Sequence, residues 1–128
     1  MEPENAQCPN STGLQGSSVL VVEDGWQVAN ELKLSLEKLG MVVTGPVATA
    51  TEARDLAAAH SPDFAIVDVN LRGEMTYALM DSLHDRGTRV IVITGYGSLP
   101  VSVKKFAAIL HKPFTAAALQ KTLLRTLD

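Results

Sequence analysis

The sequence predicts an α/β fold in which a parallel sheet of five strands is doubly wound, with helices on both faces. Short apolar runs alternate along the chain with longer segments whose apolar residues recur every three or four positions. The apolar runs lack polar alternation, which is typical of parallel strands buried on both faces. The chain has 128 residues, 46% hydrophobic and 20% charged, enough for the core of one domain.

The first half of the chain predicts two strands and two helices. Val19–Val22 and Met41–Gly45 are short β-branched runs and are the expected strands. A helix lies between them and ends at Gly40. The apolar residues of this helix share one face: Val28, Leu32, Leu36 and Leu39. Thr49 and Glu52 have the spacing of a capping box, so the second helix is expected to begin there.

The second half predicts three more strands. Phe64–Asp68 and Arg89–Thr94 are strongly apolar, and Ala107–His111 is a weaker fifth strand. A third helix is expected before Gly87, and a last helix after Pro113. Their apolar faces are marked respectively by Met75, Leu79 and Leu83, and by Leu119, Leu123 and Leu127.

The segment from Gly95 to Phe106 is the least regular part of the pattern. It contains two glycines and Pro100, and its apolar residues follow no clean period. A fourth helix in this segment is therefore expected to be short or irregular.

Composition excludes several classes of function. The net charge of −3 gives no basic field for nucleic acid or a membrane surface. Cys8 is the single cysteine, so no internal disulfide can form, and no apolar run approaches the roughly 20 residues that span a bilayer. Residues 1–17 are polar and rich in Gly and Ser, which predicts a flexible tail before a domain at 18–128. A reduced, cytoplasmic setting is expected.

Charged and hydroxyl side chains follow the strands at their carboxyl ends. Glu23 and Asp24 follow the first strand, Asp68 ends the third, Thr94 ends the fourth and Lys112 follows the fifth. Ligands of open parallel sheets bind beyond this edge. We therefore expect three acids, one hydroxyl and one ammonium to converge there.

These residue types suit phosphoryl transfer. Crowded carboxylates repel one another unless a cation is present, and Mg²⁺ prefers oxygen ligands while keeping waters for a phosphate. A carboxylate can attack phosphorus to form an acyl phosphate, and a lysine can neutralise a phosphoryl oxygen. The sequence thus predicts a Mg²⁺-assisted phosphoryl-transfer site.

The order of these residues resembles the receiver domain of bacterial two-component response regulators. The resemblance rests on Glu23-Asp24, Asp68, Thr94 and Lys112-Pro113-Phe114 at four successive strand ends, and it covers about 18–127. It implies a CheY-like, flavodoxin-like topology. The stretches "DVNLRGE", "ITGYGSLP" and "ILHKPF" also resemble stand-alone alphaproteobacterial receivers with a Phe-Ala-Thr-Gly-x-Tyr motif, although Phe-Ala is missing here.

The resemblance implies a role for each residue. Asp68 would accept a phosphoryl group from a histidine kinase or phosphotransfer protein. Asp24 and Asp68 would bind Mg²⁺ directly, Glu23 would bind it through water, and the backbone carbonyl of Asn70 would be a further ligand. Two further residues would contact the phosphoryl group. Thr94 would bond a phosphoryl oxygen and move on activation. Lys112 would pair with the phosphate, aimed by a cis bond to Pro113.

One position departs from the family pattern. Many receivers have an aromatic switch residue three positions before the lysine, where this chain has Ile109. Tyr96 is the nearest aromatic alternative, and the surface from Gly95 to Lys112 is the expected site for a protein partner. Because no second domain follows the last helix, the expected output is partner binding or phosphate carriage, with no external enzymatic substrate.

Two other functions remain open at this level. A pseudo-receiver would have the same fold and bind partners without being phosphorylated. A small flavodoxin-like binding protein is a third reading, but the first strand is followed by Glu23-Asp24 where a glycine-rich phosphate loop would be needed.

Overall fold

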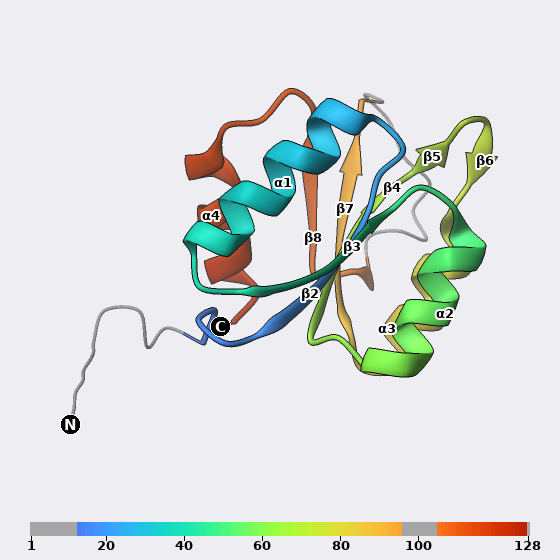
Figure 1. Cartoon of the computed structure of the whole chain (residues 1–128), viewed down its shortest axis with the longest axis horizontal. Helices are drawn as coiled ribbons and strands as arrows, with labels where there is room; N and C mark the ends of the chain where they lie inside the picture. Colours follow the sequence, from blue (N-terminus) through green and yellow to red (C-terminus); the bar gives the residue numbers. More distant parts are fainter. Residues whose placement is uncertain (1–12, 96–104, 128) are drawn as a thin grey trace.

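Five parallel strands form a central sheet in the order β3-β2-β4-β7-β8 (Figure 1). The computed structural model describes residues 13–95 and 105–127. The strands are β2 (Ser18–Val22), β3 (Val42–Val47), β4 (Phe64–Asp68), β7 (Arg89–Thr94) and β8 (Ala108–His111). The strand order changes direction at β2, which pairs with β3 on one side and with β4 on the other. The predicted five-stranded parallel sheet is confirmed.

Among the described residues, two helices cover each face of the sheet. Helices α1 (Trp26–Lys38) and α4 (Ala116–Arg125) pack on one face, and α2 (Ala50–His60) and α3 (Tyr77–Asp85) pack on the other (Figure 1). Within the described ranges, no helix has the length and apolar character needed to cross a bilayer.

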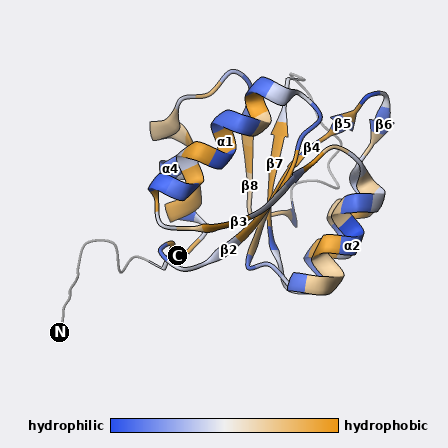
Figure 2. Cartoon of the chain, in the orientation of Figure 1, coloured by the Kyte–Doolittle hydropathy of each residue, from blue (hydrophilic) through white to orange (hydrophobic). Residues whose placement is uncertain are grey.

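Alternate residues of each central strand fill two separate cores. In β2, Val19 and Val21 pack against the α1/α4 layer, whereas Leu20 and Val22 pack against the α2/α3 layer. Neighbouring β4 and β7 divide their side chains in the same way. Figure 2 shows the resulting apolar strands between helices that are polar on the outside. Burial on both faces explains why these strands read as unbroken apolar runs.

Local capping follows the sequence signals. The backbone N–H of Glu52 donates to Thr49 Oγ1 at 3.2 Å, which confirms the predicted start of α2. Thr115 caps α4 in the same manner by accepting from the N–H of Ala118 at 3.0 Å. Gly40 has φ +83° after α1, a conformation that glycine adopts without steric cost.

The prediction that Met75 belongs to the third helix is wrong. Met75 lies in a two-stranded antiparallel hairpin formed by β5 (Asn70–Leu71) and β6 (Glu74–Met75), and its side chain is 43% exposed. Helix α3 begins at Tyr77, after Thr76 has bonded back to the end of β4. The helical spacing of Met75 to Leu79 and Leu83 is coincidental. After the Arg72-Gly73 turn, Met75 pairs with Asn70 in the hairpin, so the helix begins only beyond it.

The predicted fourth helix cannot be compared with the structure over most of its length. Residues 96–104 lie outside the described ranges, and Tyr96 with them. At the far end of this segment, Phe106 is buried in the core on the α2/α3 side.

The packed unit begins before the expected boundary at residue 17. Leu14 is 3% exposed and joins the core cluster under α1 and α4 with Leu36 and Met41. The N–H of Gly16 donates to the carbonyl of Gly40 at 2.7 Å, and the N–H of Val42 donates to the carbonyl of Ser17 at 2.9 Å. Residues 13–17 therefore pack on the domain and close one end of this core.

We expect Leu14→Ala to lower the free energy of unfolding by about 2–4 kcal/mol, because it opens a cavity beside Leu36 and Met41. Chemical denaturation followed by circular dichroism measures this. Leu34→Ala is the matched control, since Leu34 is 50% exposed on α1 and should change stability by less than about 0.5 kcal/mol. Equal effects of the two substitutions would show that the segment adds nothing to the fold.

Candidate functional site

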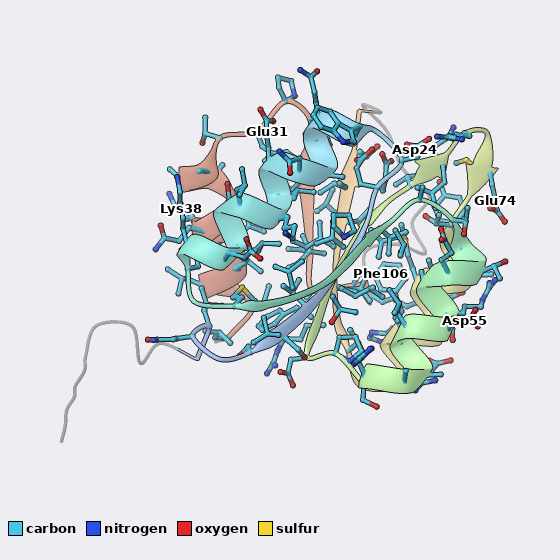
Figure 3. The ribbon with its side chains drawn as sticks, in the orientation of Figure 1. Asp24, Glu31, Lys38, Asp55, Glu74 and Phe106 are labelled. Atoms are coloured by element: carbon cyan, nitrogen blue, oxygen red, sulfur yellow. The ribbon has the colours of Figure 1, made fainter. Side chains whose placement is uncertain are left out.

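Three carboxylates meet at the carboxyl edge of the sheet. Glu23 and Asp24 follow β2, and Asp68 is the last residue of β4. One oxygen from each lies within 4.8 Å of the others. Figure 3 shows Asp24 at this edge, beside the β5–β6 hairpin. Adjacent parallel strands bring these residues together, because Val22 pairs with Val67 in register.

Lys112 supplies a positive charge to the two most buried acids. Glu23 is 3% exposed and Asp68 is 6% exposed. The Lys112 Nζ lies 2.6 Å from Asp68 Oδ2 and 2.8 Å from Glu23 Oε1. Buried carboxylates need such a partner, since an unpaired buried charge is strongly destabilising.

Burial and the neighbouring charges shift the pKa values of Glu23 and Lys112 in the folded protein. Burial raises the pKa of the Glu23 carboxyl above its ordinary value of 4.5, and Asp68 adds to this rise, while Lys112 and the Gly25 amide reduce it without cancelling it. Burial lowers the pKa of Lys112, but Asp68 and Glu23 together outweigh burial, so its pKa lies above the ordinary 10.5. Lys112 therefore stays charged, and Glu23 retains uncompensated negative charge.

The donor set of this cluster fits a hard divalent cation. Glu23 Oε2 accepts from the N–H of Gly25 at 2.7 Å. Among the described residues, Glu23 Oε1 is buried without a hydrogen bond of normal geometry, although the Lys112 ammonium is close by. A buried carboxylate oxygen in this condition, together with Asp24 and Asp68, matches the oxygen ligands that Mg²⁺ takes.

Backbone and hydroxyl groups fix the position of Asp68. The N–H of Asn70 donates to Asp68 Oδ1 at 3.0 Å. Thr76 Oγ1, which is buried, donates to the backbone carbonyl of Asp68 at 2.6 Å. No sequence signal points to Thr76, because its partner is eight residues away and only the hairpin brings the two residues together.

Thr94 and Lys112 lie beside one another at the ends of β7 and β8. Thr94 is fully buried, and its carbonyl accepts from the N–H of Lys112 at 2.7 Å. The Lys112-Pro113 peptide bond is cis, as the resemblance implied. Ile109 lies on β8 and packs partly buried against the α2/α3 core. Tyr96 lies outside the described residues, so its contacts are not part of this geometry.

Comparison with known proteins gives one family. Residues 19–124 match the model of the response regulator receiver domain. No curated protein matches the chain.

Solved structures of receivers superpose on this chain. SdrG from Sphingomonas melonis Fr1 is 31% identical, with a TM-score of 0.78 over 88% of this chain and 98% of that one. The signal receiver domain of a modulated diguanylate cyclase from Desulfovibrio desulfuricans G20 is 29% identical, with a TM-score of 0.75 over 88% and 94% of the two chains. A Burkholderia pseudomallei response regulator, crystallised with a phosphorylated aspartic acid, calcium and citrate, is 29% identical, with a TM-score of 0.76 over 84% and 66%.

We expect Glu23→Gln to stabilise the metal-free protein near neutral pH, by on the order of 1 kcal/mol. The pKa of Glu23 is raised in the folded state, so its stabilising contribution is complete below 4.5 and is lost as pH rises through the folded pKa. Glutamine resembles the protonated acid and does not suffer this loss. Urea denaturation in chelator at several pH values from 5 to 8 measures the difference.

Glu37→Gln serves as the control for this series. Glu37 is 46% exposed on α1, and its pair with Lys33 at 3.7 Å is an exposed one that contributes little to stability. Its substitution should shift stability little at any of these pH values. A gain from Glu23→Gln that does not grow with pH would contradict the assignment of uncompensated charge to Glu23.

Proposed function

Because the chain belongs to the response regulator receiver domain family, we propose that it is a signalling receiver that accepts a phosphoryl group on Asp68. The observation that carries this proposal is the bridge formed by Lys112 Nζ between Asp68 and Glu23, inside a cluster of three carboxylates. The phosphorylated aspartic acid of the Burkholderia pseudomallei response regulator supports it.

Asp68 is the proposed nucleophile. An oxygen of its carboxylate attacks the phosphorus of a phosphohistidine, the P–N bond breaks, and the imidazole leaves with the electron pair of that bond. Water later attacks the same phosphorus, which releases inorganic phosphate and restores the carboxylate. The hydrogen bonds from the Asn70 N–H and from Thr76 to Asp68 hold the attacking group in one orientation.

Glu23, Asp24 and Asp68, with the carbonyl of Asn70, are the groups that would hold Mg²⁺. The ion would neutralise charge on the transferred phosphoryl group when bound. Lys112 is proposed to exchange its contact with Asp68 Oδ2 for a phosphoryl oxygen, and Thr94 to offer its hydroxyl to another. Both are well placed for this, because their backbones are bonded to each other at the strand ends.

The proposed donor is a histidine kinase or a phosphotransfer protein, and the output is binding of a protein partner or carriage of phosphate. The chain would act on itself rather than turn over an external substrate. The expected partner surface, from Gly95 to Lys112, and the switch role of Tyr96 stay as proposals, as does membership of the Phe-Ala-Thr-Gly-x-Tyr subgroup. Ile109 can only repack in such a switch, since its side chain carries no hydrogen-bonding group.

We expect Asp68→Asn to abolish phosphorylation while leaving the fold intact. Incubation with acetyl phosphate and MgCl₂, followed by intact-mass measurement, should show the added phosphoryl group in the wild type alone. Asp55→Asn on α2 is the matched control, because Asp55 is an exposed aspartate away from the acid cluster (Figure 3). Labelling that survives in Asp68→Asn would place the phosphate elsewhere. An unmodified wild type, under conditions that label another receiver, would favour a pseudo-receiver.

We also expect phosphorylation to need a divalent ion, with the initial rate falling at least about tenfold in excess chelator. Asp24→Ala should reduce the rate more than Glu23→Ala, because Asp24 is proposed to bind the metal directly and Glu23 through water. Initial rates over a MgCl₂ series measure both effects. Equal rates with and without chelator would contradict the metal role, and a larger loss in Glu23→Ala would reverse the ligand assignment.

A further inference from the structure

The tip of the β5–β6 hairpin places an arginine where a smaller residue is usually found. Arg72 has φ +53° and Gly73 has φ +91°, so both residues of the turn are left-handed. Hairpin turns of this kind strongly favour Asn-Gly or Gly-Gly, and a long side chain at positive φ is uncommon. Arginine is therefore an unusual residue at the first position of this turn.

The hairpin is anchored to the proposed phosphorylation site. Asn70 Oδ1 accepts from the N–H of Gly73 at 2.6 Å, and the N–H of Asn70 donates to Asp68 Oδ1 at 3.0 Å. Thr76, at the base of the hairpin, is bonded to the carbonyls of Asp68 and Val69. The turn is thus held at a fixed place relative to Asp68.

From this position Arg72 reaches across to the end of the neighbouring strand. Its Nε lies 3.8 Å from Asp24 Oδ2. Arg72 and Asp24 also line a cavity of about 380 Å³ that Trp26 and Lys33 border. Within the part of the chain that the structure describes, two cations therefore pair with the acid cluster: Lys112 with Glu23 and Asp68, and Arg72 with Asp24.

We propose that Arg72 is a positioning residue that competes with the divalent ion for the Asp24 carboxylate and so lowers the affinity of the site for Mg²⁺. The proposal rests on the proposed function, because it requires Asp24 to be a metal ligand. The ion pair between the guanidinium and the carboxylate oxygen must break before a hard cation can coordinate that oxygen. Metal loading then releases Arg72 at the mouth of the site.

The geometry limits the size of the effect. Arg72 is 79% exposed and Asp24 is 20% exposed, so solvent screens the pair. Exposed ion pairs at such distances contribute little, which predicts a change in Kd of about twofold to fivefold rather than an all-or-none switch. The difference should also shrink in high salt.

The test is equilibrium Mg²⁺ binding to the full chain without any phosphodonor. Trp26 is the single tryptophan, lies two residues after Asp24 and is 78% exposed, so its fluorescence can follow a MgCl₂ titration at constant ionic strength. Arg72→Asn removes the charge and suits positive φ, and it should bind Mg²⁺ about twofold to fivefold more tightly. Arg72→Lys keeps the charge and should stay closer to the wild type.

Arg125→Ala is the control for the change in net charge. Arg125 is the last residue of α4, which follows β8 and runs back toward the opposite edge of the sheet (Figure 1). It should leave Kd unchanged. An unchanged or weaker affinity in Arg72→Asn, or an equal gain in Arg125→Ala, would overturn the competition. Absence of Mg²⁺ binding in wild type and Arg72→Asn alike would overturn the proposed metal site along with it.

Discussion

The ion pairs of Lys112 are the constraint on which the rest of the site depends. Glu23 and Asp68 are almost fully buried, and burying two carboxylates without a cation would be strongly unfavourable. Lys112 reaches them from the end of β8, past the end of β7, where its own N–H is bonded to the carbonyl of Thr94. The same lysine therefore holds the sheet edge together, and under the proposed function it would meet an incoming phosphoryl group.

Lys112 does not fully offset the burial of the Glu23 carboxylate, and this gives the site its chemical character. The raised pKa of Glu23 shows that the lysine does not balance all of the negative charge. A cluster that remained fully neutralised by its own chain would have little use for a metal ion. Here the remaining charge favours a divalent cation, while Lys112 and Arg72 occupy some of the same oxygens beforehand. Under the proposed function, the affinity for the metal ion would depend on the balance between these two effects.

Sequence patterns located most elements because the strands are buried on both faces. Unbroken apolar runs such as Phe64–Asp68 and Arg89–Thr94 were predicted with the bounds that the structure gives. The prediction that Met75 belongs to a helix is wrong because helical spacing cannot detect a two-residue turn. The reversal at Arg72-Gly73 depends on backbone conformation more than on hydrophobicity. Leu14 was missed for a related reason, since a single apolar residue in a polar segment has no period to recognise.

The sequence by itself determined the sheet, its helical layers and which residues stand at the strand ends, because periodicity and the direction of parallel strands follow from local chemistry. Only the tertiary structure decided which of these groups touch. Thr76 holds Asp68 and Arg72 meets Asp24 through a hairpin that no pattern predicted. Lys112 pairs with two acids that lie more than forty residues away in the sequence. Such contacts depend on distances and burial between distant segments, and those are fixed only when the strands pack in register.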